Sequence, residues 1–566
     1  MLFHPLNETY SELDKPSRQV MQSTIAFFED MGKRKLKEAY HGQEWYDDFV
    51  AFNKTSGAFA TLLTPRSFSN GEDQKRWDTH RICHMNEILS FYGLPYWYAW
   101  QVSILGLGPV WMSPNQDLKM RAAKQLAEGE MFAFGLSEKE HGADLYASEM
   151  RLKAHGPGAW LADGRKYYIG NGNVARMVST FAMDPDSKEY VFFVADSQHP
   201  NYNCIQNIVA WQGYVAEYEL NAYPVSQGDI LSRGSKAWDS ALNTVNVGKF
   251  NLGWASIGIA THAFYEAINH AAHRNLYGKF VTDFPHVQSL FVDAYCRLVA
   301  MRMFASRARD YFRSASLEDR RYLLYNPLVK MKVTTQGEDV INHLWDVIAA
   351  KGFEKGTYFE MAAKEIRALP KLEGTVHVNM ALVVKFMKNY FFNSIQLPEV
   401  SRRVDPKDDE FLFQQGPARG LSAIQFHDYK EIYKAFSTPN LDRFKQQIQF
   451  LVQFLIDSPP TAEQARDIDF LLQLGECFTL VVYGQLILEE AKLSLVSEAL
   501  IDQIFHVFVR DFSRYALALY SKPQLNAKQA KNVYSMILQP DYQKSSFEHV
   551  WREAILPGVD AYEMRR

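Results

Sequence analysis

The chain is predicted to adopt an α+β fold that is mostly α-helical. Two patterns support this: hydrophobic residues recur at helical spacing over most of the sequence, and only residues 131–231 show short alternating strands. At 566 residues, the length suits roughly three to four structural units. The predicted parts are an N-terminal helical domain at 1–130, a β domain at 131–245, a four-helix bundle at 246–396, a linker at 397–420 and a C-terminal helical domain at 421–566.

The composition is that of an ordinary globular protein, with 47% hydrophobic and 22% charged residues. A net charge of −4 gives no basic footprint for nucleic acid, so we expect no nucleic-acid partner. The four cysteines are far apart and form no C-x-x-C pair, which favours a reduced, cytoplasmic protein without a disulfide framework or a cysteine-rich metal site. We predict no metal site.

Neither the N-terminus nor the most apolar stretch of the chain suggests membrane insertion. The N-terminus lacks a basic segment followed by an apolar run, so no secretory signal is predicted. The most apolar stretch, residues 470–488, is interrupted by Gln473, Glu476 and Gln485. We therefore expect a core helix there and no membrane span.

The N-terminal domain begins with a clear helix signal. Asp14 is a typical N-cap, and Pro16 stands where no amide hydrogen is needed. This helix should run to about Tyr40 and stop at Gly42. Further helices are expected up to about Gly129.

Between residues 131 and 231, short β-branched or aromatic segments alternate with turn signals. The turns include Asp163-Gly164 and Asn171-Gly172. We predict an antiparallel β domain.

Helical periodicity returns near residue 246. Long helices are expected over residues 249–274, 285–314, 327–350 and 376–392, forming a four-helix bundle. The region from 424 to 566 is again helical and is expected to be a separate unit.

The segment 371–375, Lys-Leu-Glu-Gly-Thr, lies between two of these helices. Gly374 lets the backbone come close to whatever the Glu373 carboxylate faces. Taken alone, such a tripeptide most often marks a surface turn with a solvated acid. Its interpretation depends on three upstream motifs, at residues 132–144, 164–172 and 274–288.

Together, the four motifs and the order of the domains resemble the acyl-CoA dehydrogenase family. Residues 132–144 are similar to the family's aromatic-x-x-Thr-Glu-Pro-x-x-Gly-Ser-Asp loop, and residues 164–172 to its Gly-x-Lys-x-Trp-Ile-Thr-Asn-Gly. Residues 274–279 resemble its Arg-x-x-Phe-Gly-Lys segment. The C-terminal domain looks like the extension of very-long-chain acyl-CoA dehydrogenases and acyl-CoA oxidases.

The resemblance implies an FAD site and assigns residues to it. In the β domain these are Phe134, Leu136, Ser137, Tyr168 and Gly170. Ser137 keeps the hydroxyl of the family's Thr, whereas Gly170 lacks the side chain that bonds flavin N5. Gly142, Ala143 and Lys249 are assigned to the acyl-CoA substrate, although a helix-end Lys249 is also read as merely solvated.

The helical regions contribute the remaining residues. Arg274 is assigned to the FAD pyrophosphate of a neighbouring subunit, which implies at least a homodimer. Tyr277 and Gln288, in the same segment, are also assigned to the cofactor. Arg274 is otherwise read as a solvated residue at a helix end. The remaining cofactor positions are Asp346, Gly374, Thr375 and His377.

Glu373 is assigned as the catalytic base of acyl thioester α,β-dehydrogenation. The α-proton is too weakly acidic for a carboxylate in water, so the base must lose water, which raises its pKa. We expect FAD-dependent oxidation of a long-chain fatty acyl-CoA to the trans-2-enoyl-CoA in β-oxidation, with an electron-transfer flavoprotein as acceptor.

Three alternatives remain open. In an acyl-CoA oxidase, O₂ would reoxidise the flavin; the C-terminal domain favours this, whereas the contiguous Glu373-Gly374-Thr375 does not. A DNA-binding relative would need a basic face on residues 424–566, where charges of both signs are mixed. Action on carrier-bound acyl groups is the third.

Overall fold

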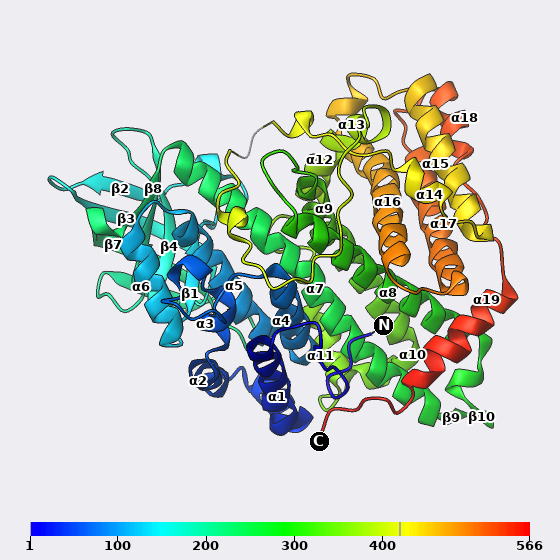
Figure 1. Ribbon diagram of the computed structural model, residues 1–566, viewed down its shortest axis with the longest axis horizontal. Coiled ribbons are helices and arrows are strands. Elements are labelled where there is room, and N and C mark those ends of the chain that lie inside the picture. Colours follow the sequence, from blue (N-terminus) through cyan, green and yellow to red (C-terminus); the bar gives the residue numbers. More distant parts are fainter. Residues whose placement is uncertain (1, 418–419, 566) are drawn as a thin grey trace. The chain divides into compact units, whose positions relative to one another are not determined.

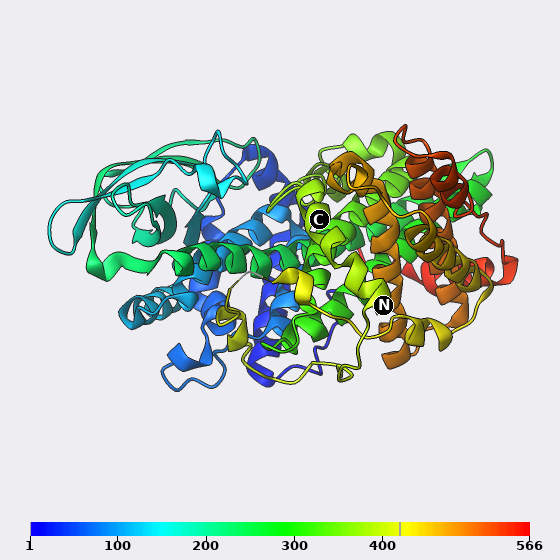
Figure 2. The ribbon, with the colours of Figure 1, turned by 90° about the horizontal axis from the view of Figure 1, so that it is seen from above.

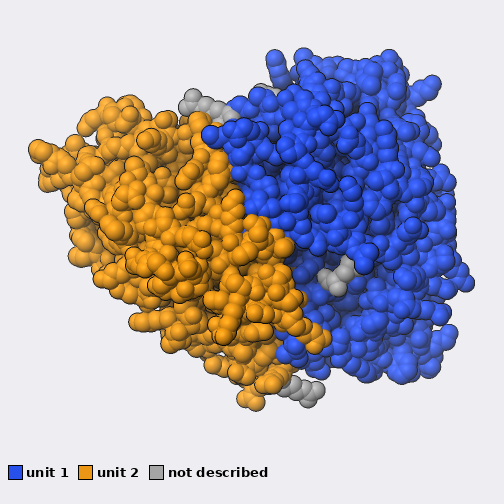
Figure 3. All heavy atoms as spheres, viewed as in Figure 1, with its two compact units in different colours: residues 1–6, 252–403, 420–563 blue, residues 7–251, 404–419, 564–566 orange. Residues whose placement is uncertain are grey.

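The computed structural model describes residues 2–417 and 420–565, and the chain divides into two compact units (Figure 3). Unit 1 comprises residues 1–6, 252–403 and 420–563. Unit 2 comprises residues 7–251, 404–419 and 564–566. Each unit is described separately below.

Unit 2 begins with helices, as predicted. The Asp14 side chain accepts a hydrogen bond from the Ser17 amide at 3.0 Å, so Asp14 caps the first helix. That helix ends at Gly42 and is interrupted by non-helical backbone at Gly32. The helices are α1 (Lys15–Gly42), α2 (Asp47–Ser56), α3 (Ala58–Leu63), α4 (Thr79–Tyr92), α5 (Leu94–Met112) and α6 (Gln116–Ala127).

An eight-stranded sheet follows, with the order β6-β7-β3-β2-β4-β5-β8 and β1 paired to β4. The strands are β1 (Phe132–Gly135), β2 (Arg151–Ala154), β3 (Ala159–Gly170), β4 (Met177–Met183), β5 (Tyr190–Ala195), β6 (Tyr202–Asn207), β7 (Val215–Ser226) and β8 (Ile230–Arg233). The expectation of a purely antiparallel domain was wrong, because β1 runs parallel to β4. Parallel neighbours need a long crossover, and here β2 and β3 lie between them in the sequence.

Helix α5 packs unusually close to β1. A Cβ atom at Gly106 would lie 2.6 Å from the Ala133 amide nitrogen, so only glycine fits there. The Ser179 hydroxyl on β4 donates to the Gly106 carbonyl at 2.7 Å. These contacts fix the first strand, and hence the loop that follows it, against α5.

The long helix α7 (Ser235–His273) starts in unit 2 and ends in unit 1. It begins 14 residues before the predicted position 249, since the polar start 235–246 gives little apolar periodicity. In unit 1 it is followed by a small hairpin, β9 (Asn275–Leu276) and β10 (Lys279–Phe280), and by α8 (Pro285–Arg313), which was predicted almost to the residue.

Two predicted bundle helices are divided into shorter pieces. The segment expected at 327–350 is α9 (Tyr322–Leu328), a π-helical turn (Val329–Val333) and α10 (Thr334–Ile348). After α11 (Tyr358–Glu365), the segment expected at 376–392 is α12 (Val376–Val383) and α13 (Met387–Phe392), joined by a 3₁₀ turn. Pro327, expected to start a helix, lies inside α9.

The C-terminal helices belong to the same compact unit as the bundle. Figures 1 and 2 show α16 and α17 side by side, and both pack on α8. Buried charge pairs join them to α8, including Arg297 with Asp511 at 2.6 Å and Arg307 with Glu489 at 2.8 Å. The helices are α14 (Lys430–Lys434), α15 (Pro439–Asp457), α16 (Ile468–Leu493), α17 (Glu498–Tyr520), α18 (Ala527–Tyr534) and α19 (Lys544–His549).

Among the described residues, α16 alone is long and apolar enough to cross a membrane by length and composition. Its most apolar window has a mean hydropathy of 1.5, but 78% of that window is buried. Helix α16 therefore packs as a core helix of unit 1, as the sequence predicted.

Candidate functional site

The loop after β1 is tied to β3 by the predicted residue Ser137. Its hydroxyl donates to the Tyr167 carbonyl at 2.8 Å, and the Tyr167 amide donates to the Ser137 carbonyl at 3.0 Å. The hydroxyl oxygen keeps its capacity to accept a further hydrogen bond. The neighbouring residues Phe134 and Leu136 are half-buried.

A buried ion pair that the sequence reading did not single out anchors this loop. Glu138 accepts hydrogen bonds from Lys166 Nζ at 2.7 Å and Ser148 Oγ at 2.8 Å, and Lys166 also donates to the Leu136 carbonyl at 3.0 Å. Burial alone would raise the pKa of Glu138, but the charge and hydrogen bond of Lys166 hold it below its ordinary value. Strand β3 also contains Asp163 and Arg165, so its charge alone did not distinguish Lys166 in the sequence.

Tyr168 lies in an irregular part of β3. The register with β7 shifts between Tyr167 and Ile169, and the Tyr168 backbone has φ +71°, a left-handed conformation rare for a residue with a side chain. Its ring remains 45% exposed. The bulge thus turns an aromatic face outward at one end of the sheet.

Gly170, two residues later, has no room for a side chain. A Cβ atom would lie 2.6 Å from Tyr98 Cε1 and 2.7 Å from Val102 Cγ1, both on α5. Tyr98 and Val102 therefore occupy the side-chain space at this position. A threonine at this position, as in the family pattern, would clash with α5.

The three predicted substrate residues differ in exposure. Gly142 and Ala143 are exposed in the loop between β1 and β2. Lys249 is 9% exposed and lies well inside α7. The alternative of a solvated lysine at a helix end is therefore wrong.

In unit 1, Glu373 lies on the short loop between α11 and α12. Its backbone has φ +52° and that of Gly374 φ +86°, so two consecutive residues are left-handed. The Oε2 atom of Glu373 is buried from solvent. The loop ends at Thr375, whose hydroxyl caps α12 by accepting from the Val378 amide at 3.4 Å.

The other predicted residues of unit 1 lie elsewhere. Tyr277 and Gly278 form the turn of the β9–β10 hairpin, both with positive φ, and Tyr277 is 97% exposed. Arg274 precedes this hairpin and is exposed, while Gln288 on α8 donates to the Thr282 carbonyl at 2.9 Å. In Figure 1 this hairpin and α12 lie at opposite ends of unit 1. Asp346 and His377 are both exposed.

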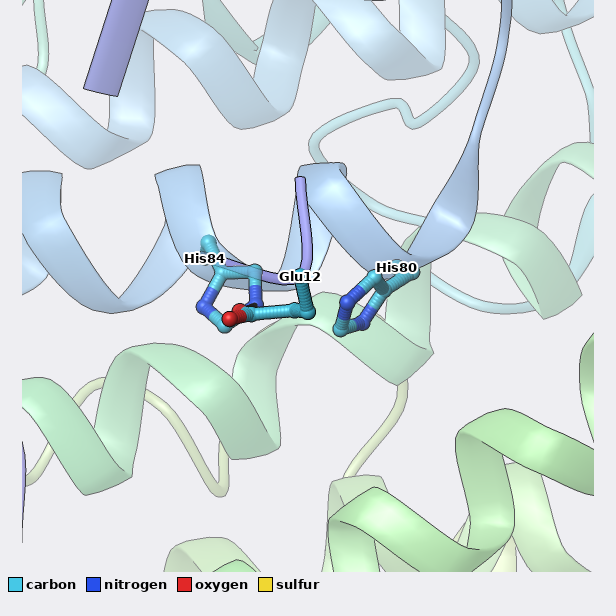
Figure 4. Close-up of side chains that lie close together, drawn as sticks. All are labelled: Glu12, His80 and His84. Carbon is cyan, nitrogen blue, oxygen red and sulfur yellow. Dashed lines mark ion pairs between the residues drawn. The ribbon is translucent and has the colours of Figure 1, made fainter. Parts of the chain in front are cut away.

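A cluster of potential metal ligands lies in unit 2 and includes none of the predicted site residues. Figure 4 shows His80 and His84 of α4 beside Glu12. His84 Nε2 is 3.2 Å from a Glu12 carboxylate oxygen, and the two imidazole rings meet edge to face at 4.7 Å. One donor atom from each residue lies within 4.8 Å of the other two.

Comparisons with known proteins find similarity to acyl-CoA dehydrogenases. The family model described as "Acyl-CoA dehydrogenase, C-terminal domain" matches residues 236–388. A 3-(aryl)acrylate reductase of Clostridium sporogenes is 22% identical over 288 residues, covering 50% of this chain and 75% of that protein. A short-chain-specific acyl-CoA dehydrogenase of Megasphaera elsdenii is 23% identical over 305 residues, 51% of this chain and 78% of that protein.

A solved structure extends the likeness in fold to nearly the whole chain. The acyl-CoA dehydrogenase of Bacillus anthracis, complexed with FAD, has a TM-score of 0.74 at 14% identity and covers 97% of this chain and 96% of its own. Helical, β and C-terminal helical parts therefore recur together in that protein. Residues 236–388 thus match the C-terminal domain of acyl-CoA dehydrogenases, and the fold of nearly the whole chain is similar to that of one such enzyme.

Proposed function

We propose that the protein is an FAD-dependent acyl-CoA dehydrogenase that oxidises a long-chain acyl-CoA to the trans-2-enoyl-CoA, with Glu373 as the base. The observation that carries the proposal is the backbone of Glu373. A non-glycine residue in the left-handed region is uncommon, and such conformations concentrate at functional sites. The buried Oε2 atom fits a base that has lost water.

The residues of unit 2 fit a planar cofactor in three respects. Tyr168 offers an exposed aromatic face, Ser137 retains an accepting hydroxyl oxygen, and the Glu138–Lys166 pair makes the loop rigid. A bound flavin supplies the acceptor for the β-hydrogen. The residues proposed to hold it are Phe134, Leu136, Ser137, Tyr168, Gly170, Gly374, Thr375 and His377.

The chain itself provides the proton transfer and its geometry. Glu373 takes the α-proton of the thioester, and Gly374 lets the substrate come close to the backbone. An amide N–H near the thioester oxygen would stabilise the developing negative charge, which is typically worth several kcal/mol. Lys249, together with Gly142 and Ala143, would bind the acyl-CoA.

The test is anaerobic addition of palmitoyl-CoA to the purified protein. We expect the yellow flavin to bleach in the wild type. Glu373→Gln should keep the flavin spectrum but lose turnover by about 10²–10⁴-fold, the usual contribution of a positioned base. A Glu373→Gln protein that bleaches at the wild-type rate would place the base elsewhere.

A second candidate is an acyl-CoA oxidase, favoured by the C-terminal helices that pack on the bundle. The same sample separates the two. Slow recolouring in air, with fast reoxidation by an electron-transfer flavoprotein, supports the dehydrogenase. Rapid recolouring with formation of peroxide supports the oxidase.

A further inference from the structure

A buried lysine on the π-helical turn contacts the loop that carries Glu373. Lys330 is fully buried. Its Nζ donates a 2.7 Å hydrogen bond to the Pro370 carbonyl and a second hydrogen bond to the Gly374 carbonyl. These two carbonyls lie on either side of Glu373 in the loop.

The contact matters because this loop is held in an unfavourable conformation. Left-handed backbone at Glu373 persists only where the surroundings fix it. Asn379 Nδ2 also donates to the Gly374 carbonyl, at 3.1 Å, and to the Thr375 carbonyl at 2.9 Å. Lys330 and Asn379 therefore both hold the Gly374 carbonyl.

The π-helical turn Val329–Val333 contacts two different parts of unit 1 through two lysines. Lys332, also buried, lies 3.4 Å from Glu476 on α16 and donates to the Tyr515 hydroxyl on α17 at 3.0 Å. Lys330 faces the Glu373 loop, while Lys332 faces the C-terminal helices. Single π turns inside helices occur frequently at functional sites.

We propose that Lys330 is a positioning residue for the reaction. It holds the backbone on both sides of Glu373, so that the carboxylate meets the substrate in one orientation. This inference rests on the proposed role of Glu373 as the base. The Lys330 ammonium bonds backbone carbonyls and is not itself assigned a proton-transfer step.

The test compares Lys330→Met with Lys385→Met, an exposed lysine beyond α12. Misplacing a reacting group by about 1 Å can cost roughly 10²-fold, so we expect kcat of Lys330→Met to fall about 10–100-fold. KM for palmitoyl-CoA should change less than about twofold, since the variant changes no residue assigned to the substrate. The visible spectrum should still show bound flavin. Lys330→Arg should recover part of kcat, and Lys385→Met should match the wild type.

A double variant separates positioning from a general structural role. If Lys330 acts through Glu373, Lys330→Met adds no further loss to Glu373→Gln. Additive losses, or a wild-type kcat in folded Lys330→Met, would overturn the proposal. If Lys330→Met does not fold, Asn379→Ala tests the same peptide and should lower kcat with KM retained. Failure of the proposed function shows separately, as a wild type that does not bleach.

The Glu12–His80–His84 cluster carries a second, independent inference. His80 and His84 are one helical turn apart on one face of α4, and a carboxylate from another segment completes the three. In a tetrahedral zinc site, ligand atoms lie roughly 3.3 Å apart, close to the 3.2 Å between His84 and Glu12. We propose that these three side chains bind one Zn²⁺, with the fourth position open.

The charges nearby do not oppose a cation. Arg76 is paired with both Asp14 and Asp78, and Arg81 donates to backbone carbonyls and to Ser17. Two imidazoles and one carboxylate are a common zinc ligand set. Closing the 4.8 Å cluster around an ion requires a side-chain shift of little more than 1 Å.

The test is titration of metal-free, full-length protein with ZnCl₂, followed by calorimetry. We expect one Zn²⁺ per chain. His84→Gln and Glu12→Gln should each weaken binding at least tenfold, whereas His41→Gln, on the distant end of α1, should not. Absence of stoichiometric binding, or equal binding by all variants, would show that the cluster is only a carboxylate–imidazole ion pair.

Discussion

At the residue scale, Gly170 yields a prediction opposite to the one the family pattern suggests. Restoring the family's Thr by Gly170→Thr should not improve flavin binding, because Tyr98 and Val102 occupy that space. We expect a loss of stability of about 1–3 kcal/mol from overpacking. Thermal denaturation measures it.

The matched control is Gly228→Thr, since the nearest neighbour of a Cβ atom there, Ser226 Oγ, is 3.5 Å away. It should leave the denaturation midpoint nearly unchanged. If Gly170→Thr is as stable as the wild type and binds FAD more tightly, α5 must move and the steric argument fails.

The motifs in the sequence were enough to assign residues to the candidate site. They did not reveal which side chains lie next to those residues in the fold. Ser137 and Thr375 were assigned by motif, and the structure adds that one ties two strands and the other caps a helix. The contact of Tyr98 with Gly170 was not predicted, because Tyr98 lies on an apolar helix some 70 residues before the motif that contains Gly170. Lys249 was read as a helix end because the polar first turns of α7 hide its true start.

At the element scale, α16 supports the helix that follows Glu373. A Cβ atom at Gly475 would lie 2.3 Å from Met380 Sδ and 2.9 Å from Val384 Cγ1. Gly475→Leu should therefore displace α12 and lower kcat at least tenfold with the flavin retained. Gly475→Ala is the control, since the flexible Met380 thioether can yield.

Steady-state kinetics and the visible spectrum measure this effect. Loss of flavin together with activity in Gly475→Leu would instead indicate general unfolding. Equal activity of the two variants would show that α12 does not depend on α16.

The pairing of Arg307 on α8 with Glu489 on α16 predicts a pH dependence. Burial alone would raise the pKa of Glu489, but the hydrogen bond from His427 and the charge of Arg307 lower it to about 2. A lowered carboxyl pKa stabilises the fold above the unfolded value, about 4.3, and that stabilisation is lost as the pH falls through about 2.

Glu489→Gln should therefore destabilise the protein at pH 7, by about 1–3 kcal/mol, because the buried Arg307 loses one of its two carboxylate partners and keeps only Asp310. The difference from the wild type should shrink as the pH falls from 5 to 2. Denaturation midpoints across this range measure it. Glu399→Gln, which removes an exposed partner of Lys492, is the control, and a pH-independent difference would contradict the assignment.

Element types were well predicted, whereas helix continuity was not. α8 has uninterrupted periodicity and matched closely. The π turn at Val329–Val333 and the 3₁₀ turn before α13 leave no mark in composition, since their residues suit any helix. Such breaks arise from tertiary contacts, here those of Lys330 and Lys332.

At the scale of the whole molecule, the position of Arg274 predicts shared active sites. Arg274 precedes an exposed hairpin far from α12 within the same unit (Figure 1). If it serves the flavin of a second copy, Arg274→Met and Glu373→Gln subunits should complement each other when mixed. An intact Glu373 would then meet an intact Arg274 from its partner.

We expect each variant alone to be nearly inactive and mixed, refolded subunits to recover up to about a quarter of wild-type activity, as random pairing of two-subunit assemblies gives. Light scattering should show at least a dimer. Recovery no greater than the sum of the separate variants would assign Arg274 to its own subunit.

The change from helices to strands and back to helices was predictable because the hydrophobic period changes near residues 131 and 246. The union of bundle and C-terminal helices in one unit was not, since it depends on pairs such as Arg297 and Asp511, which are 214 residues apart. No local pattern reveals a contact over that separation.

These distant ion pairs bear on how the protein is made. Arg297 and Arg307 have carboxylate partners within α8, Asp293 and Asp310, but their pairs with Asp511 and Glu489 form only after α17 and α16 have left the ribosome. Before that point, the face of α8 that packs against α16 and α17 stays uncovered. A stalled or truncated product would expose this face and be recognised by chaperones and proteases.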